Sequence, residues 1–214
     1  MALNQTIQQK TLENWPQIQQ RLLEYILAVK IRSLEIVFSP LTNPDMLWLL
    51  IPLIANIFLL EFYFSRHKHE ELGWNTAYGN ALVLLFIAIM LAKHLYEQGI
   101  LYTHQTKFII VLIVILFGIS LTVIDFFHWL PKNIAFKISS KIPVNYLALV
   151  AIILVYTDFP VDYITASAFV VVLMGLLILI GIIHVITPKV REVLLPPPPP
   201  STDEELKKIS KNLF

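Results

Sequence analysis

The sequence predicts an all-α fold: a polytopic membrane helix bundle of about five transmembrane helices, preceded by an amphipathic helix that lies in the membrane interface. Composition is the first reason. The 214-residue chain is 57% hydrophobic and 14% charged, whereas soluble proteins average about 45–50% apolar and about 25% charged residues. The second reason is pattern, because apolar stretches fill most of residues 46–187.

Five apolar stretches cover residues 46–64, 76–96, 108–125, 144–157 and 163–186. A helix needs about 20 apolar residues to cross a hydrocarbon core of roughly 30 Å, and every stretch except the fourth has or approaches that length. We expect the fourth either to extend backward through Ile142 or to form a tilted, partly re-entrant helix paired with the fifth. Residues 44–187 are therefore the predicted transmembrane domain.

An amphipathic helix is predicted within the N-terminal domain, residues 1–43. Apolar residues in the segment 16–38 recur every three or four positions, which is the period of a one-sided helix. Pro16 suits the first helical turn, and Ser39 and Pro40 are expected to end the helix. The apolar positions are Leu22, Leu23, Ile26, Leu27, Ile31, Leu34, Val37 and Phe38.

The charged residues of this segment decide where the helix lies. At mid-membrane, several of them would each cost about 2.5–3.5 kcal/mol. We therefore expect a helix about 35 Å long in the interface, with Lys30 snorkelling out of the apolar stripe. Its water-facing residues would be Arg21, Glu24, Arg32 and Glu35. The same periodicity also fits a soluble helix packed on a partner or on a sister subunit.

The C-terminal part is predicted to be a spacer, residues 188–200, followed by a short docking helix, residues 201–214. Five consecutive prolines at 196–200 predict a polyproline II rod about 15 Å long. Ser201 and Glu204 have capping-box spacing, and lysines follow toward the end. The residues that would dock on a partner are Leu206, Ile209, Leu213 and Phe214. Without docking, so short a helix would fray.

Lysine and arginine near the span ends predict the orientation. One side receives Arg66, Lys68, Lys132, Lys137, Lys141, Lys189 and Arg191, and the other receives Lys30, Arg32, Lys93 and Lys107. The positive-inside rule makes the first side cytoplasmic. The sequence thus predicts a cytoplasmic C-terminus, with the N-terminal helix on the opposite side.

The middle of the spans carries no ionisable residue. Glu61, Lys93, His94, Asp125 and His184 all lie within about two turns of a span end. Coupled transporters place carboxylates and broken helices near the midplane, so the sequence disfavours classical coupled transport. The polar and small residues inside the spans instead suit helix packing. These are Asn56, Gly118, Ser120, Gly175 and Gly181.

One membrane face gathers residues of the types that bind transition metals. They are Glu61, His67, His69, Asp125, His128 and His184. Such a set could hold a metal whose bound water hydrolyses a bond near the membrane surface. The alternative is an ordinary solvated belt, since the His-x-His pattern is common and the sequence has no HExxH motif. Apart from a transition metal at this face, no cofactor is indicated.

Composition excludes other classes. A net charge of +1 gives no basic face for nucleic acid. The absence of cysteine excludes disulfides, thiolate metal sites and cysteine nucleophiles.

On the other membrane face, Asp158 and Asp162 flank Pro160. This pattern fits either a pore mouth that attracts cations or a plain turn between helices.

The sequence favours a non-enzymatic multi-pass protein that acts as a subunit of a membrane complex or of a homo-oligomer. Its partners would be the lipid bilayer and further copies or other subunits, with the cytoplasmic tail engaging one of them. The first alternative is a homo-oligomeric channel gated by its apolar midplane. The second is a membrane metalloenzyme that uses the histidine and carboxylate face.

Overall fold

The computed structural model describes the backbone of residues 2–66 and 73–194, and the side chains of residues 16–63, 73–183 and 185–186. Every regular element within these ranges is an α-helix, which confirms the predicted fold class. The helices are α1 (Ala2–Thr42), α2 (Pro44–Arg66), α3 (Trp74–Glu97), α4 (Gln105–Phe127), α5 (Lys132–Ile138), α6 (Lys141–Tyr156) and α7 (Tyr163–Leu194).

Five helical segments are long and apolar enough to cross a membrane. They are Pro44–Tyr63, Trp74–Glu97, Gln105–Phe127, Lys132–Tyr156 and Tyr163–Ile183. The chain is therefore an integral multi-pass membrane protein. The tail residues 195–214, with their predicted spacer and docking helix, lie outside the described residues.

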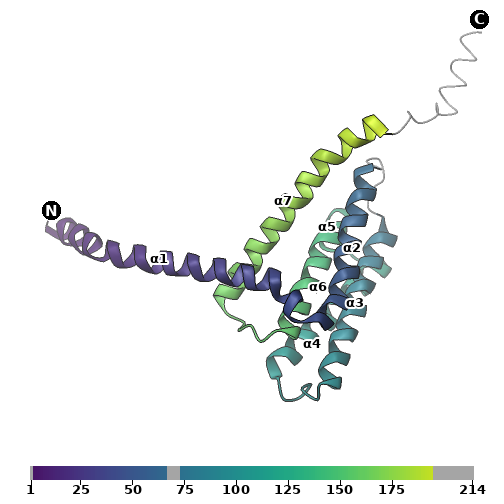
Figure 1. The fold of residues 1–214 in the computed structure, drawn as a ribbon, viewed down its shortest axis with the longest axis horizontal. Helices are drawn as coiled ribbons and strands as arrows, with labels where there is room; N and C mark the ends of the chain where they lie inside the picture. Colours follow the sequence, from purple (N-terminus) through teal and green to yellow (C-terminus); the bar gives the residue numbers. More distant parts are fainter. Residues whose placement is uncertain (1, 67–72, 195–214) are drawn as a thin grey trace, which may run out of the picture.

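Four helices form the bundle: α2, α3, α4 and α6 pack side by side, and α5 lies at one end (Figure 1). Their core is aliphatic, with Leu84, Leu91 and Ile152 fully buried. Helix α7 runs obliquely past the bundle and packs on α1 and α2. It is the least covered span, because 17% of its apolar window is buried against 44% for Lys132–Tyr156.

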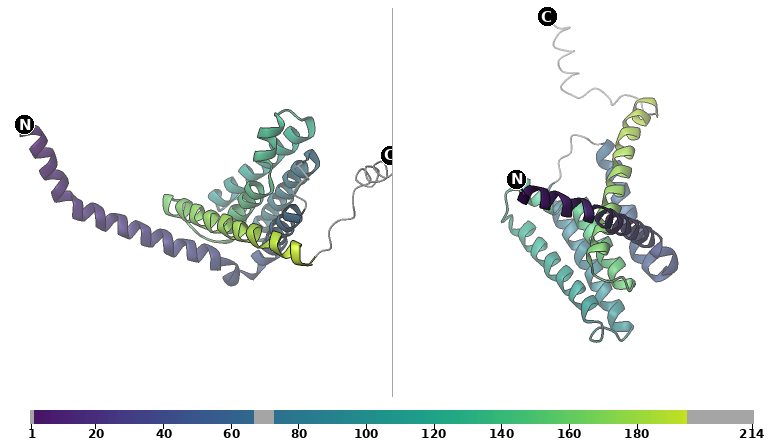
Figure 2. Two further views of the ribbon diagram at one scale, coloured as in Figure 1. Left: turned by 90° about the horizontal axis from the view of Figure 1, so that it is seen from above. Right: turned by 90° about the vertical axis from the view of Figure 1, so that its left-hand side faces the viewer.

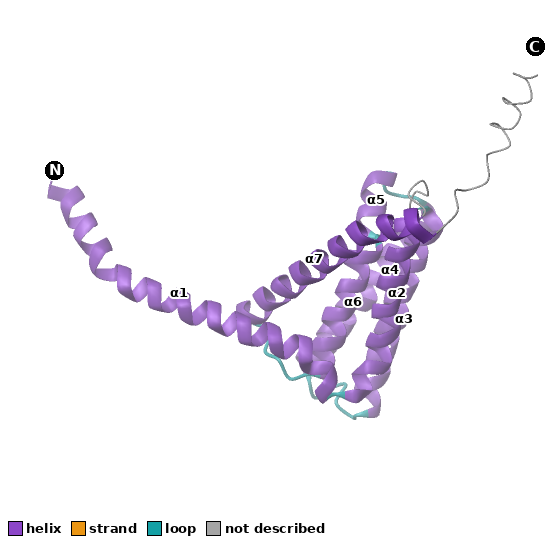
Figure 3. Ribbon diagram, turned by 45° about the horizontal axis from the view of Figure 1, so that its top comes forward, coloured by secondary structure: helices purple, strands orange, loops and turns teal. Residues whose placement is uncertain are grey.

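Helix α1 reaches far beyond the bundle. Its C-terminal part crosses α7, while its N-terminal part projects away from all the other helices (Figures 2 and 3). It begins at Ala2 and runs through Pro16 and Pro40, so the expected boundaries at these prolines are wrong. Pro40 leaves the carbonyl of Ile36 without its usual donor, and the Ser39 hydroxyl donates to that carbonyl at 2.8 Å. The helix can therefore continue to Thr42.

The fourth span is two helices joined at a break. It starts at Lys132 and so extends farther backward than the apolar run 144–157, with α5 and α6 meeting at Ser139 and Ser140. Pro143 has no N–H with which to donate to the Ser139 carbonyl, so a continuous helix would lose that bond. The side chain of Asn80 donates to the Ser139 carbonyl instead, at 2.8 Å.

Candidate functional site

A cluster of buried polar side chains gathers where the α5–α6 break meets the ends of α2, α3 and α4. Each member is less than 10% exposed: Glu61, Asn80, Asp125, Ser139, Lys141 and Asn145. Polar groups this buried are costly unless they are paired. How each is paired therefore shows what the cluster can do.

An ion pair joins α2 to α6. The Lys141 ammonium lies 2.6 Å from the Glu61 carboxylate, and the two side chains are 11% and 4% exposed. Buried partners of this kind depend on each other, since removing one leaves the other charge without compensation. The pair therefore fixes the position of the α6 N-terminus against the end of α2.

Two asparagines donate hydrogen bonds to backbone carbonyls around the break. Asn80 of α3 donates to the Ser139 carbonyl, and Asn145 donates to the Lys141 carbonyl at 2.7 Å. Each amide supplies a donor to a backbone carbonyl of the α5–α6 region. The break is thus held from α3 and from within α6.

Asp125 is the member of the cluster that α4 contributes. It is 1% exposed and lies next to Ser139. Within the described part of the chain, neither of its carboxylate oxygens makes a hydrogen bond of normal geometry. Asp125 therefore belongs to the packing of α4 against the α5–α6 break.

The contacts of the cluster join separate helices, because Lys141 pairs with Glu61 of α2 and Asn80 of α3 donates to the Ser139 carbonyl. The arrangement is therefore suited to holding α2 and α3 against the α5–α6 break.

Of the predicted metal ligands, the structure describes the side chains of Glu61, Asp125 and His128. Glu61 pairs with Lys141, while Asp125 belongs to the Ser139 side of the cluster. His128 ends α4 with a left-handed φ of 55°, and its ring lies tilted against Trp74, with ring centroids 4.1 Å apart. Among the described residues, no three His, Cys, Asp or Glu side chains form a group that could hold a metal. His67, His69 and the side chain of His184 lie outside the described set, so the metal site stays a prediction.

The predicted packing residues divide into two kinds. Gly118 lies against α3, and a Cβ added there would stand 2.8 Å from Leu85 Cδ2. A Cβ added at Gly175 or Gly181 would meet nothing within 4 Å. Ser120 is exposed and donates to the Leu116 carbonyl of its own helix, and Asn56 is half-buried. Close packing at Gly175 or Gly181 would need a helix from outside the described part of the chain.

The two aspartates around Pro160 stabilise the turn between α6 and α7. Asp158 accepts a hydrogen bond from the Lys107 ammonium at 2.9 Å, and this contact holds the pKa of the Asp158 carboxyl below its usual range. Asp162 accepts from the Thr165 backbone N–H at 2.7 Å and caps α7, and this bond lowers the pKa of the Asp162 carboxyl. Both carboxylates thus have structural roles in the turn.

Helix α1 is fastened to the start of α7 by polar contacts. The Tyr25 hydroxyl lies 2.5 Å from the Ser167 hydroxyl. Arg32 reaches the Thr165 hydroxyl at 3.4 Å, and its guanidinium lies 4.9 Å from the centre of the Phe159 ring. The side of α1 that carries Arg32 therefore faces the α6–α7 loop.

The apolar stripe of α1 is left uncovered. All eight predicted stripe residues are exposed, and the residues that contact the rest of the protein are mainly Val29, Ser33 and Ile36 on a different face. A second exposed apolar surface lies along α7 beyond Phe169, where seven apolar side chains are at least half exposed. These two faces are the most extensive candidate interaction surfaces of α1 and α7.

Sequence reasoning missed the role of Lys141, which it counted only among the basic residues near the span ends. The available signal was that Glu61 and Lys141 both lie near a span end on the same membrane face.

No known family model, curated protein or solved structure matches this chain. Its function must therefore be inferred from its own residues.

Proposed function

We propose that this multi-pass membrane protein is a non-enzymatic subunit of a homo-oligomer, in which the exposed face of α7 packs against α7 of another copy. One observation carries the proposal. Five residues of α7 recur at alternating steps of three and four and are all exposed: Val171, Met174, Ile178, Gly181 and Val185.

The spacing of this α7 seam, as we call these five residues, suits a second helix. Alternating steps of three and four keep residues on one line when two helices cross at about 20° in left-handed packing. Its large side chains are 50–66% exposed, and Gly181 offers a place where a second backbone can approach closely.

We also infer that α1 lies in the membrane interface beside this seam. Arg32 marks the side of α1 that faces the α6–α7 loop, whereas Ile26 and Leu34 lie beside Val170 and Val171, farther along α7. The exposed stripe of α1 therefore faces along α7 toward the hydrocarbon. This is the orientation of an interfacial amphipathic helix.

Cysteine cross-linking tests the oligomer directly, because the chain has no cysteine of its own. Single cysteines at Met174, Ile178, Gly181 and Val185 are oxidised in native membranes, with Leu179 on another side of α7 and Ile113 on α4 as exposed controls. We expect covalent dimers at the seam positions and none at the controls. Equal yields at all positions, or no dimer at any, would contradict the proposal.

The cytoplasmic tail is proposed to engage a further component of the assembly. Deleting residues 196–214 leaves the membrane spans intact, so the oligomer should persist while the tail-bound component is lost from the complex in mild detergent. An unchanged composition would exclude tail docking. Ion flux through liposomes that hold the cross-linked oligomer would favour the channel alternative, and metal retained by the purified protein would favour the metalloenzyme.

A further inference from the structure

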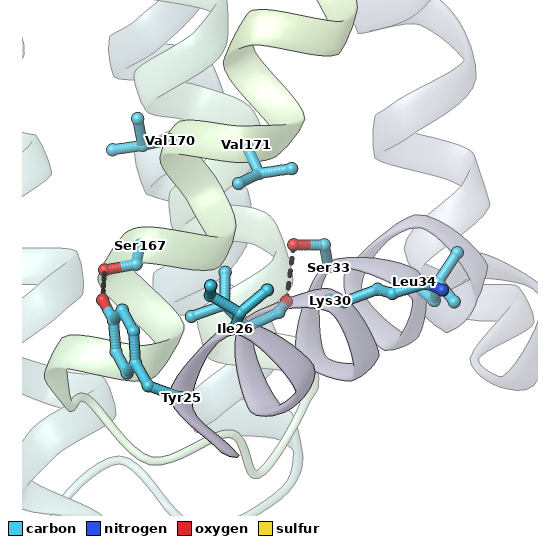
Figure 4. Close-up of a pocket in the computed structure, with 9 residues that line it drawn as sticks. Tyr25, Ile26, Lys30, Ser33, Leu34, Ser167, Val170 and Val171 are labelled. Atoms are coloured by element: carbon cyan, nitrogen blue, oxygen red, sulfur yellow. Dashed lines mark hydrogen bonds between the residues drawn. The ribbon is translucent and has the colours of Figure 1, made fainter. Parts of the chain in front are cut away.

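The corner between α1 and α7 contains an apolar pocket of about 620 Å³. Its lining comes from three turns of α1 and the second and third turns of α7 (Figure 4): Tyr25, Ile26, Val29, Lys30, Ser33, Leu34, Ser167, Val170 and Val171. The hydroxyls of this lining are already engaged, because Tyr25 bonds with Ser167 and Ser33 donates to the Val29 carbonyl at 2.7 Å. The pocket therefore offers an apolar wall and one free polar group, the Lys30 ammonium.

Lys30 carries a charge that its surroundings do not neutralise. It is exposed and lies between Ile26 and Leu34 on one row of α1, and all three line the pocket. The nearby acids of α1 have other contacts, since Glu35 pairs with Arg32 at 3.0 Å and Glu24 accepts from Gln20 at 3.0 Å. No ion pair to Lys30 occurs within the described residues. The pocket is therefore complementary to an anion attached to an apolar chain.

The depth of the pocket follows from the contacts between the two helices. Helix α1 touches α7 at Thr165, Ser167 and Ala168, which lie about 3–8 Å along the helix from Tyr163. Beyond this crossing, α7 continues into its apolar span with Val170 and Val171. If α1 lies in the interface, the pocket stands at the boundary between headgroups and acyl chains.

We propose that this corner binds an anionic phospholipid. One acyl chain lies against Val170 and Ile26, and the lipid phosphate contacts the Lys30 ammonium. This inference rests on the interfacial placement of α1 but not on the α7 seam. Charge complementarity selects the anionic headgroup, because a cation near a membrane surface attracts acidic lipids. The apolar wall selects a lipid over free phosphate, which would leave that wall exposed to water.

Native mass spectrometry of the full chain tests the site with two probes, phosphatidylglycerol and phosphatidylcholine of identical acyl chains. We expect the wild type to retain phosphatidylglycerol preferentially, and Lys30→Gln to lower that preference roughly fivefold, as expected for the loss of one interfacial cation. Lys30→Arg keeps the charge and should keep the preference. Lys93→Gln is the matched control, an exposed lysine on the same predicted membrane face.

The apolar wall is tested by Val170→Phe, which narrows the pocket, leaves Lys30 intact and lies outside the α7 seam. Retention of both lipids should fall, whereas Ile113→Phe on the exposed surface of α4 should change neither. The proposal fails if Lys30→Gln retains lipid like the wild type, if Lys93→Gln loses the preference equally, or if Val170→Phe binds as before.

The premise is tested separately by placing a single cysteine at Leu27 in the α1 stripe and measuring its labelling by a water-soluble maleimide in membranes. Protection supports the interfacial placement, so a lipid-binding failure in that case rejects only the lipid site. Full labelling rejects the placement and the lipid site together.

Discussion

The ion pair between Glu61 and Lys141 gives the sharpest stability prediction. Changing Glu61 to Gln keeps the size of the side chain and removes its charge. The Lys141 ammonium, whose side chain is 11% exposed, then loses the charge of the carboxylate that lies 2.6 Å from it.

The magnitude follows from burial. Removing one partner of a buried ion pair costs about 3–5 kcal/mol. For a chain of this size, such a loss corresponds to a fall of roughly 6–20 °C in the unfolding midpoint. Replacing both partners with methionine removes both charges together, and we expect that double variant to recover most of the loss.

Thermal unfolding in detergent, followed by tryptophan fluorescence, measures the effect. The matched control is Glu97→Gln, which breaks the Lys93–Glu97 pair at 3.4 Å, where both side chains are about 60% exposed. That exposed pair should contribute less than about 0.5 kcal/mol. If Glu61→Gln shifts the midpoint no more than Glu97→Gln does, the buried pair is not stabilising the break and the reasoning is refuted.

Three further predictions concern other helix contacts. Gly118→Leu should destabilise the protein by about 1–3 kcal/mol through overpacking, whereas Gly175→Leu, with open space at its Cβ, should leave the midpoint unchanged. The contact of Asp158 with Lys107 lowers the Asp158 pKa, so its contribution is present above about pH 4 and disappears as the pH falls through that lowered value. Asp158→Asn should therefore lower the midpoint slightly at pH 7, by less than about 1 kcal/mol in stability, with the difference gone in acid. Asp162→Ala should destabilise the start of α7 and Asp162→Ser should restore it, as read from hydrogen exchange of that first turn.

The architecture was largely predictable because hydrophobic length is a strong signal. Apolar runs of span length predicted the membrane helices, and five helices suited to span are present. The start of the fourth span at Lys132 was not predicted, because the polar residues around Ser139 hide a helix that resumes on the other side of a break. That break depends on Pro143 and on an amide from α3, which is a tertiary contact.

The helix boundaries at prolines show a second limit. Ser39 and Pro40 form a typical helix stop, yet α1 continues because the Ser39 hydroxyl satisfies the carbonyl that Pro40 leaves free. Rules based on the local sequence give the usual role of a proline. They do not show whether a neighbouring side chain replaces the backbone N–H that the proline lacks.

The buried cluster was only partly visible in the sequence. Glu61 and Asp125 were singled out as carboxylates near one membrane face, but their partners come from the α5–α6 region, far along the chain. In the sequence, Lys141 looks like an ordinary lysine at the membrane surface. Only the packing of α6 against α2 shows that its ammonium is buried on a carboxylate.

The number of copies in the native assembly tests the central proposal most directly. Fluorescently tagged protein, extracted with its surrounding lipid and counted by single-molecule photobleaching, should show two or more copies per particle. Gly181→Leu blocks the close approach at the α7 seam and should reduce the count to one, while Ala55→Leu, an exposed small residue on α2, should not. Single copies in the wild type, or an unchanged count in Gly181→Leu, would contradict self-association through α7.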